Sequence, residues 1–579
     1  GSLLLLPWTD PNNHLKDDKA WRNHCGDAYV QLRDHVSADM ATEKIKNIPT
    51  PFIKDWTETA LIYPLDKMHL YSEFVNGKPS GGRIQYVRLF AIIGAFVLLL
   101  ACINFMNLST ARSSKRAKEV GIRKTVGSLS RHLIGQFLIE SVLLTFMAFG
   151  IALLLVQFSL PFFNELAGKH MSIPYANPVF WALCIGFALF TGILSGSYPA
   201  FYLSSFEPIK VLKGAFQGSR YNSIPRQVLV VLQFSVSLSL IIGTIVIYRQ
   251  IAFVKDRPSG YTRQGLITLP INTDDLNKHF ETFREDLLHT GVASDIAGSS
   301  QPITLFNNNN SMDWRGKDPG QVIFFRNVNV TPEFGKTIKW KLLSGRDFSR
   351  EYADSNSMLL SEAAAKVTGI ANPVGELMKF GGKYYTVVGV VKDMLTNSPY
   401  ETIEPAIFLG DGYRDFITIR LKAGLPVHDA MASLEKVYKK YNPGSPFVYH
   451  YNEDEYAHKF AAEERIGNLS AVFAGMAIFI SCLGLFGLAS FVAEQRTKEI
   501  GVRKVLGANL FSLWTLLSKQ FVKLVLISFC IAIPVSFYGM NSWLEGYTYR
   551  EAISWWIFGI AGLSILLITL LTVSYQSIK

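Results

Sequence analysis

Ionisable side chains of the types that bind metals or transfer protons gather at one place in this sequence. His450, Glu453, Asp454, Glu455 and His458 bring two imidazoles and three carboxylates within nine residues, and both groups serve as metal ligands and as acids or bases. These residues also precede a long apolar segment. The simpler explanation is that they are solvated charges on a stalk that leads into it. We favour that explanation, so the sequence predicts neither catalytic residues nor a metal site.

Patterns that carry nucleotide or covalent chemistry are absent from the sequence. No phosphate-binding loop of the form G-x-x-x-x-G-K-[ST] occurs among the 579 residues, and no nucleophile-elbow, zincin or kinase pattern is found. If ATP drives this protein, another polypeptide must therefore bind it. The chain itself is predicted to be non-catalytic and to bind no cofactor.

Long apolar segments make up much of the chain and are expected to position its functional polar residues. Hydrophobic residues make up 49% of the chain and charged residues 18%, against roughly 25% charged in a soluble protein. Seven segments reach the roughly 20 residues needed to cross a bilayer, at about 88–111, 137–160, 179–203, 227–248, 468–492, 521–540 and 553–575. A soluble protein with seven such buried helices would be far outside the norm. The predicted fold class is a polytopic α-helical membrane protein.

The basic residues orient these spans. The formal net charge is +11, and it concentrates in residues 112–135 (+6), 204–226 (+3) and 493–520 (+3). All three segments fall on one side of a seven-span arrangement, and an excess of Lys and Arg marks the cytoplasmic side. Residues 1–87 and 249–467 are then external. Nucleic acid loses its support as a partner, because membrane orientation already accounts for the basic residues.

The beginning of the chain suggests a missing segment. Gly1-Ser2 stands where an initiator methionine would be expected, and no signal-like region follows. Seven spans with an external N-terminus is also an odd arrangement. We expect eight spans in the complete protein, the first span and the front of one external domain being absent here.

An internal repeat is the most specific feature of the sequence. Residues 101–127 align with 481–507 at a fixed offset of 380 without gaps. Lys118–Gly127 (KEVGIRKTVG) and Lys498–Gly507 (KEIGVRKVLG) share six of ten residues, and most of the other pairs are aliphatic. Both copies follow a span at its predicted cytoplasmic end. The chain therefore contains two copies of one unit, each with a span, an external domain and further spans.

Several segments resemble the MacB/FtsX-type ABC transporter permeases. In the membrane part they are the repeated Lys118–Lys124 and Lys498–Lys504, the Ser-Tyr-Pro-Ala-Phe-Tyr run from Ser197 to Tyr202, and Gly484–Phe491. In the external part, Ser344–Phe348, Tyr385–Asp393 and Ile403–Pro405 are similar to the family's periplasmic core domain. The chain looks most like the duplicated eight-span members found in Bacteroidota, truncated at both ends.

The resemblance implies that each repeated segment is a coupling helix that docks on a separate cytoplasmic ATPase. Physically, a basic segment bounded by glycines can form a helix along the cytoplasmic face, with Gly127 and Gly507 as its stops. The alternative is that Lys and Arg only satisfy topology and lipid headgroups, and the repetition favours docking. The predicted docking residues are Lys118, Glu119, Gly121, Arg123, Lys124, Gly127, Lys498, Glu499, Gly501, Arg503, Lys504 and Gly507.

Small residues within the spans predict close helix packing. Gly192 and Gly196 form a G-x-x-x-G pattern. Asn104 and Asn107 can either hydrogen-bond across helices or line a path through the membrane. We favour packing, because the positions equivalent to Asn104 and Asn107 in the second copy hold Gly484 and Gly487.

The predicted domains follow from the spans and the repeat. Residues 1–87 are the C-terminal part of a first periplasmic domain, and 88–248 hold the first FtsX-like transmembrane unit plus the span that opens the second copy. Residues 249–467 are a second periplasmic core domain, and 468–579 are the second transmembrane unit. Strand-like and helix-like runs alternate within 249–467, which predicts an α+β fold.

By resemblance, the chain is expected to be a permease subunit in a bacterial inner membrane with its large domains in the periplasm. It would couple ATP hydrolysis by a partner ATPase dimer, which holds ATP and Mg²⁺, to movement of the periplasmic domains for export or extrusion of a substrate. A periplasmic adaptor and an outer-membrane protein are further candidate partners. Lipoprotein release, and a non-transporting sensor with a ligand-binding ectodomain, are the alternatives.

Overall fold

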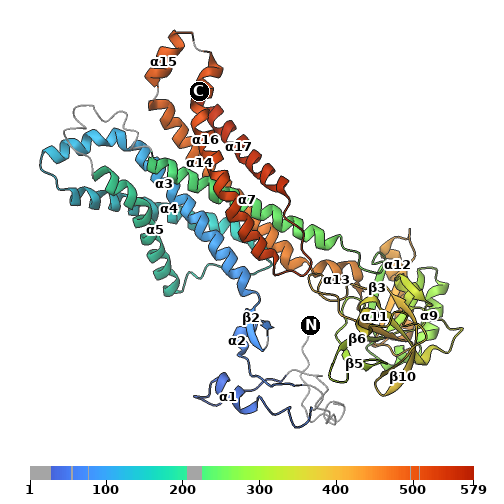
Figure 1. The fold of residues 1–579 in the computed structure, drawn as a ribbon. Helices are drawn as coiled ribbons and strands as arrows, with labels where there is room; N and C mark the ends of the chain where they lie inside the picture. Colours follow the sequence, from blue (N-terminus) through green and yellow to red (C-terminus); the bar gives the residue numbers. More distant parts are fainter. Residues whose placement is uncertain are drawn as a thin grey trace. The chain divides into compact units, whose positions relative to one another are not determined.

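A computed structural model describes residues 28–53, 57–75, 77–204, 224–495, 497–507 and 509–578. Seven of the described helices are long and apolar enough to cross a membrane (Figure 1), which confirms the predicted fold class. They are α3 (Ile84–Thr125), α4 (Ser130–Ala167), α5 (Pro178–Ser204), α7 (Ile224–Lys255), α14 (Ala461–Gln495), α16 (Leu510–Leu544) and α17 (Trp555–Ile578). Six of the seven predicted spans lie within these helices, and the seventh, 553–575, begins two residues before α17. Pro534 stands inside a continuous α16.

The chain divides into two compact units. The membrane unit contains residues 90–258 and 454–579 together with the short segment 398–402. The α+β unit contains residues 259–397 and 403–453 as well as the chain up to Leu89. Before α3 the described elements are α1 (Ala38–Ile45), α2 (Leu65–Met68) and the hairpin of β1 (Glu73–Val75) and β2 (Lys78–Gly81).

Helix α7 is the central element of one helix group in the membrane unit. Its residues Val230, Phe234, Leu238, Ile242 and Val246 recur every three or four positions and are buried, so they form one stripe along the helix. This stripe packs in a single apolar core with α14, α16 and α17, which run alongside it (Figure 1). Half of the most apolar window of α7 is buried, a larger share than in any other described span.

Side-chain hydrogen bonds supplement this packing. The hydroxyls of Ser237 in α7 and Ser481 in α14 lie 2.8 Å apart in a buried contact. Ser528 in α16 donates to the carbonyl of Val231 at 3.0 Å, and Thr244 donates to the carbonyl of Ser470 at 3.3 Å. Polar bonds of this kind hold helices together in lipid, where apolar contact alone gives little preference for protein over lipid.

Seven strands of the α+β unit form a sheet in the order β7-β10-β8-β11-β6-β5-β9. Because β9 also pairs with β10, six of these strands close on themselves, and an apolar core fills the interior. The strands are β5 (Asn309–Asp313), β6 (Phe324–Asn329), β7 (Leu342–Gly345), β8 (Ser357–Ser361), β9 (Leu377–Phe380), β10 (Lys383–Val391) and β11 (Ala406–Leu409). The associated helical elements are α10 (Phe334–Ile338), η3 (Asp354–Asn356) and α11 (Glu362–Thr368).

The second sheet of this unit has four antiparallel strands in the order β13-β3-β12-β4. They are β3 (Leu266–Pro270), β4 (Ala293–Ser299), β12 (Phe416–Leu421) and β13 (His450–Tyr451). Helices α9 (Phe280–His289) and α12 (Val427–Tyr441) bury their apolar faces in a common core with it, while α8 (Asp274–Lys278) precedes α9 and α13 (Asn452–His458) follows β13. The α+β character predicted for this region is confirmed.

The His450–His458 segment forms β13 and α13 at the end of this sheet. Among the described residues, no group of three His, Cys, Asp or Glu side chains is placed to hold a metal ion. The segment joins the last strand of the sheet to α14.

The Ser344–Phe348 segment builds a charge pair that stabilises the fold. Arg346 donates two hydrogen bonds to Asp354, Nη1 to Oδ2 at 2.9 Å and Nη2 to Oδ1 at 2.7 Å. The Ser357 hydroxyl and the Ser349 amide also donate to Asp354. Burial by itself raises the pKa of Asp354, but these hydrogen bonds and the Arg346 charge outweigh burial and lower it.

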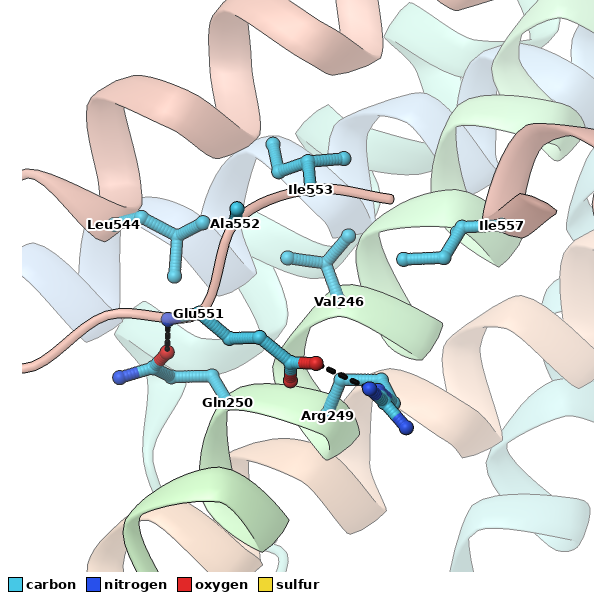
Figure 2. A pocket seen from close by; sticks show the side chains of 8 residues that line it. All are labelled: Val246, Arg249, Gln250, Leu544, Glu551, Ala552, Ile553 and Ile557. Atoms are coloured by element: carbon cyan, nitrogen blue, oxygen red, sulfur yellow. Dashed lines mark hydrogen bonds and ion pairs between the residues drawn. The ribbon is translucent and has the colours of Figure 1, made fainter. Parts of the chain in front are cut away.

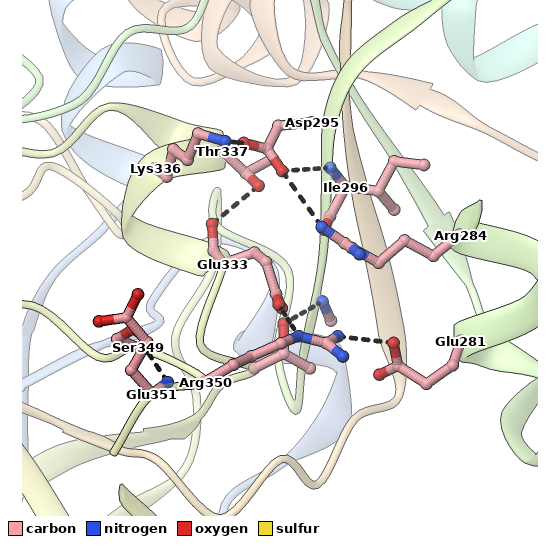
Figure 3. A network of polar contacts seen from close by, with 12 residues as sticks. Glu281, Arg284, Asp295, Ile296, Glu333, Lys336, Thr337, Ser349, Arg350 and Glu351 are labelled. Carbon is pink, nitrogen blue, oxygen red and sulfur yellow. Dashed lines mark hydrogen bonds and ion pairs between the residues drawn. The ribbon is translucent and has the colours of Figure 1, made fainter. Parts of the chain in front are cut away.

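A network of ion pairs joins α9, β4 and α10 (Figure 3). Arg350 bonds to Glu333 and also to Glu281, the second contact at 2.5 Å. Asp295, whose side chain is 6% exposed, lies 3.0 Å from Lys336 and 3.9 Å from an Arg284 nitrogen. Since every carboxylate in this group faces a cation, the network is a structural brace.

Arg420 in β12 is buried and bonds to backbone carbonyls. Its guanidinium donates to the carbonyls of Thr337, Gln264 at 2.9 Å and Thr262 at 2.8 Å. Burial lowers the pKa of Arg420, while Asp295 opposes that effect. The three bonds tie β12 to α10 and to the segment that enters β3.

We predict that Asp354→Asn weakens the α+β unit, because it removes the charge that Arg346, Ser349 and Ser357 satisfy. Losing a charged hydrogen-bond partner costs about 1.5–3 kcal/mol, so amide exchange in β8 should accelerate roughly ten- to a hundredfold at pH 7. Hydrogen exchange of the chain in lipid nanodiscs measures this. The ionised form stabilises the fold above about pH 4, and this contribution is lost as pH falls through the lowered pKa.

Glu351→Gln is the matched control for this prediction. Glu351 lies in the same loop, is exposed, and loses the same charge. Equal exchange rates in the two variants would contradict the role assigned to Asp354.

Candidate docking segments and helix-packing sites

The first copy of the repeat is the end of α3. The predicted span of α3 ends at about residue 111, but the helix continues to Thr125, an extension of about 21 Å at 1.5 Å per residue. Glu119 and Arg123 pair across one helical turn with a nitrogen–oxygen distance of 2.5 Å. Arg123 also donates to the side-chain oxygen of Gln136 in α4 at 2.9 Å. The first copy is thus helical and continuous with the span of α3.

The second copy lies in α15. Helix α14 is described as far as Gln495, and α15 spans Thr497–Val505; the Thr497 hydroxyl donates to the carbonyls of Ala493 and Glu494. Glu499 and Arg503 pair at 2.7 Å, at the same positions as the pair in the first copy. Both copies therefore present an arginine that is already held in place by a glutamate one turn earlier, an arrangement that also supports the helix by about 0.3–0.5 kcal/mol.

Both segments end at the predicted glycines. Gly127 has φ +97 and Gly507 has φ +86, the left-handed region that favours glycine. The amide of Gly127 donates to the carbonyl of Lys124, and that of Ser128 to Arg123, which is the Schellman arrangement at a helix C-terminus. In the second copy the Gly507 amide likewise donates to Lys504.

Lys124 is tied to another helix. Its ammonium donates to the carbonyl of Ser204, the last residue of α5 that the structure describes, at 2.6 Å. With Arg123 bonded to α4, the first segment is joined to both α4 and α5. Lys124 thus positions the segment, in addition to whatever it contacts from outside.

Exposed apolar side chains lie beside the basic residues in both segments, a feature that sequence reasoning missed. Ile122 is 54% exposed and Val126 82% in the first copy. In the second copy Val502 is 60%, Val505 89% and Leu506 80% exposed. Apolar residues next to arginines at a projecting helix end are typical of a protein-binding surface. Their only signal in the sequence is their place inside the repeat.

The remaining predicted docking residues lie in the same two segments. Gly121 is inside α3, and Gly501 is inside α15 with open space where a Cβ would stand. Lys504 is exposed. The side chains of Lys118 and Lys498 lie outside those that the structure describes. No contact in the structure tests docking itself, which stays a prediction.

Gly192 and Gly196 bring α5 against α4. A Cβ on Gly196 would lie 2.6 Å from the Cβ and Oγ of Ser141, and one on Gly192 would lie 3.0 Å from the Cα of Val142. Ser141 is buried. Both glycines are therefore contact points at which any side chain would force the two helices apart.

Gly484 and Gly487 bring α14 against α3. A Cβ on Gly484 would lie 2.7 Å from Oδ1 of Asn104 and 3.0 Å from Nε2 of Gln233 in α7. A Cβ on Gly487 would lie 2.1 Å from a methyl group of Leu108. The four glycines singled out in the sequence thus all lie at helix contacts in the structure.

A clamp at the other end of α7 was not predicted. Gln250 is 1% exposed; its Nε2 donates to the carbonyl of Tyr549 at 2.7 Å, and its Oε1 accepts from the amide of Glu551 at 3.0 Å. Arg249 pairs with the Glu551 carboxylate (Figure 2) and lies over the ring of Trp556. A single glutamine thereby fixes the loop between α16 and α17, and a recess lies beside it.

Two family descriptions match most of the chain. The FtsX-like permease C-terminal family matches residues 91–208 and 471–579, and the MacB-like periplasmic core domain matches residues 235–437. The chain belongs to the MacB/FtsX-type permeases. Each FtsX-like match contains one copy of the repeat and one of the glycine pairs described above. The duplication seen in the sequence is thus a duplication of the FtsX-like region.

Curated relatives of this permease include two macrolide export ATP-binding/permease proteins MacB. The protein from Bdellovibrio bacteriovorus is 35% identical over 127 residues, which are 22% of this chain and 19% of that protein. The protein from Campylobacter jejuni is 26% identical over 209 residues, 36% of this chain and 30% of that protein. The permease therefore spans less than a third of the length of these two relatives.

Two solved structures resemble part of the chain. The periplasmic region of MacB from Actinobacillus actinomycetemcomitans covers 35% of this chain and 96% of that structure, with 15% identity and a TM-score of 0.26. A domain of a putative permease protein from Porphyromonas gingivalis covers 28% and 79%, with 17% identity and a TM-score of 0.22.

We predict that Gly196→Leu separates α4 from α5, because the new side chain collides with Ser141. The permease in detergent should lose several degrees of apparent melting temperature, measured by fluorescence-detected size exclusion after heating. Gly186→Leu is the control: Gly186 lies on the same helix, is exposed, and has open space at its Cβ position. An equal loss in both variants would show that the packing contact is not responsible.

Proposed function

We propose that this permease is the membrane subunit of an ABC export system in a bacterial inner membrane, driven by a separate cytoplasmic ATPase. The proposal rests above all on the repeated helix end, in which a Glu–Arg pair, exposed apolar residues and a glycine stop recur in both copies. The 579 residues contain no phosphate-binding loop, so the proposal places ATP hydrolysis outside them.

The repeated segments suit docking because they combine charge with apolar area. Arginine and exposed aliphatic residues at one helix end fit a shallow apolar groove with an acidic rim. The Glu119–Arg123 and Glu499–Arg503 pairs limit the conformations of each arginine before contact, so less side-chain entropy is lost on binding. Two copies of the surface call for two ATPase subunits, each meeting one segment.

The connection of the first segment to its helices suggests how motion passes inward. Force applied to Arg123 and Lys124 reaches α4 through Gln136 and α5 through Ser204, and α3 is continuous with the segment. We infer that closure of the ATPase pair displaces these spans as a group. The MacB-like domain, which lies in the periplasm in this proposal, would move substrate or an adaptor protein in response.

We predict that Arg123→Glu with Arg503→Glu weakens association with the cognate ATPase. The exchange reverses two charges and removes both preorganised pairs, so the affinity should fall at least tenfold, about 1.4 kcal/mol. Co-purification of the tagged permease with the co-expressed ATPase, together with ATP hydrolysis by the complex, measures the effect. The control is Arg131→Glu with Lys519→Glu, which makes the same charge change at exposed residues outside the repeats.

If the Arg123→Glu, Arg503→Glu protein bound the ATPase as tightly as the unchanged permease, the docking role of the repeat would be contradicted. Loss of binding in the control as well would mean that bulk positive charge, and not the repeated segment, holds the ATPase.

We predict that Val126→Ser with Leu506→Ser weakens ATPase binding without disturbing the fold. Both side chains are at least 80% exposed, so polar substitution should leave the apparent melting temperature within about one degree of that of the unchanged permease. Loss of apolar contact should lower the affinity about fivefold to fiftyfold. Size exclusion after heating and microscale thermophoresis with the purified ATPase test the two halves of this expectation separately. A wild-type affinity would exclude these residues from the contact.

A further inference from the structure

The contact between α3 and α14 joins equivalent positions of the two repeats. Asn104 and Gly484 are related by the offset of 380 that aligns the copies, and in the structure they touch each other. Leu108 meets Gly487, the counterpart of Asn107. A residue that contacts its own counterpart lies on the axis that relates the two halves.

Contacts elsewhere along the two helices follow the same relation. The rings of Phe90 and Phe473 lie 6.0 Å apart, and Asn104 Nδ2 donates to the carbonyl of Ile480 at 3.5 Å. In each contacting pair the two residue numbers differ by 380, the repeat offset, to within four residues. Helices α3 and α14 therefore run parallel and nearly in register. This is the geometry of a local pseudo-twofold axis along the helices.

A twofold relation means that each contact between two residues is matched by a second contact between their counterparts in the other copy. The counterpart of the Phe90–Phe473 contact is Ile93 near Ser470, and that of the Leu108–Gly487 contact is Asn107 near Leu488. These four counterpart positions are buried. Ile93 is 7%, Ser470 5%, Asn107 0% and Leu488 3% exposed.

The residues on the axis differ in size in a complementary way. Asn104 fills the space that Gly484 leaves, and the buried Oδ1 of Asn104 finds no hydrogen-bond partner there. A Cβ on Gly484 would lie 2.7 Å from Oδ1 and 3.1 Å from Cγ of Asn104 and 3.0 Å from Nε2 of Gln233, so an asparagine there would displace both side chains. Two glycines would leave a gap. Packing between unequal residues, and not a polar bond of Oδ1, therefore selects the pairing.

We propose that the α3–α14 seam is the interface through which the two halves of this chain recognise each other, with Asn104 and Gly484 as its specificity-determining pair. One chain then supplies both halves of a two-halved permease, and this seam does not accept the like half of a second chain. The inference goes beyond the proposed function, because it concerns pairing within the membrane and holds whether or not an ATPase docks.

Exchanging the two residues tests the proposal. Gly484→Asn alone should lower the apparent melting temperature by several degrees, and Asn104→Gly alone by less, because the first change creates a collision and the second a gap. The double exchange, Asn104→Gly with Gly484→Asn, should recover at least half of the loss. Gly475→Asn is the control, since Gly475 lies exposed on α14 with open space around it. A double exchange as unstable as Gly484→Asn would overturn the pairing.

Cross-linking tests the same pairing without relying on stability. With the five native cysteines replaced by serine, Asn104→Cys with Gly484→Cys places two thiols near disulfide range, because Asn104 Cγ is 3.1 Å from the Cβ position of Gly484. Oxidation with copper phenanthroline in membranes should yield a cross-link within one chain in most molecules. A product at twice the chain mass, or no cross-link in a protein that remains monodisperse, would refute the proposal.

Discussion

Close approach between helices is the constraint on which the membrane part of this structure depends. In lipid every backbone group must be satisfied inside its own helix, and apolar side chains gain little by leaving lipid for protein. Association then depends on small residues that let backbones meet and on buried side-chain bonds. Gly196 against Ser141, Gly484 against Asn104, and the Ser237–Ser481 bond are the places where this happens.

The same constraint favours polar side chains and their hydrogen bonds at the helix ends, outside the hydrocarbon. Once a helix leaves the hydrocarbon, its last carbonyls need partners, and the amides of Gly127 and Ser128 supply them at the end of α3. At the other end of α7, Gln250 performs the corresponding task for the α16–α17 loop. A partner that binds side chains at such ends can move the rigid helix to which they belong. The proposed function requires such a connection.

Much of this architecture could be predicted from the sequence, because local or repeated residue patterns determine it. Span length, the glycine stops and the packing glycines each have a direct physical signature. Contacts such as Lys124 with Ser204, or Gln250 with Tyr549, join residues far apart in sequence and arise only when the helices pack.

Duplication within one chain changes what the contact between the halves can contain. In a symmetric pair of identical chains, a residue on the twofold axis must fit itself, which restricts it to small or self-complementary types. Here each copy has only to fit the other, so one position can hold asparagine and its counterpart glycine. Gln233 flanks Gly484 on one side of this contact. The seam thereby acquires two chemically different sides, and the halves of the permease need not move or bind alike even though they share a fold.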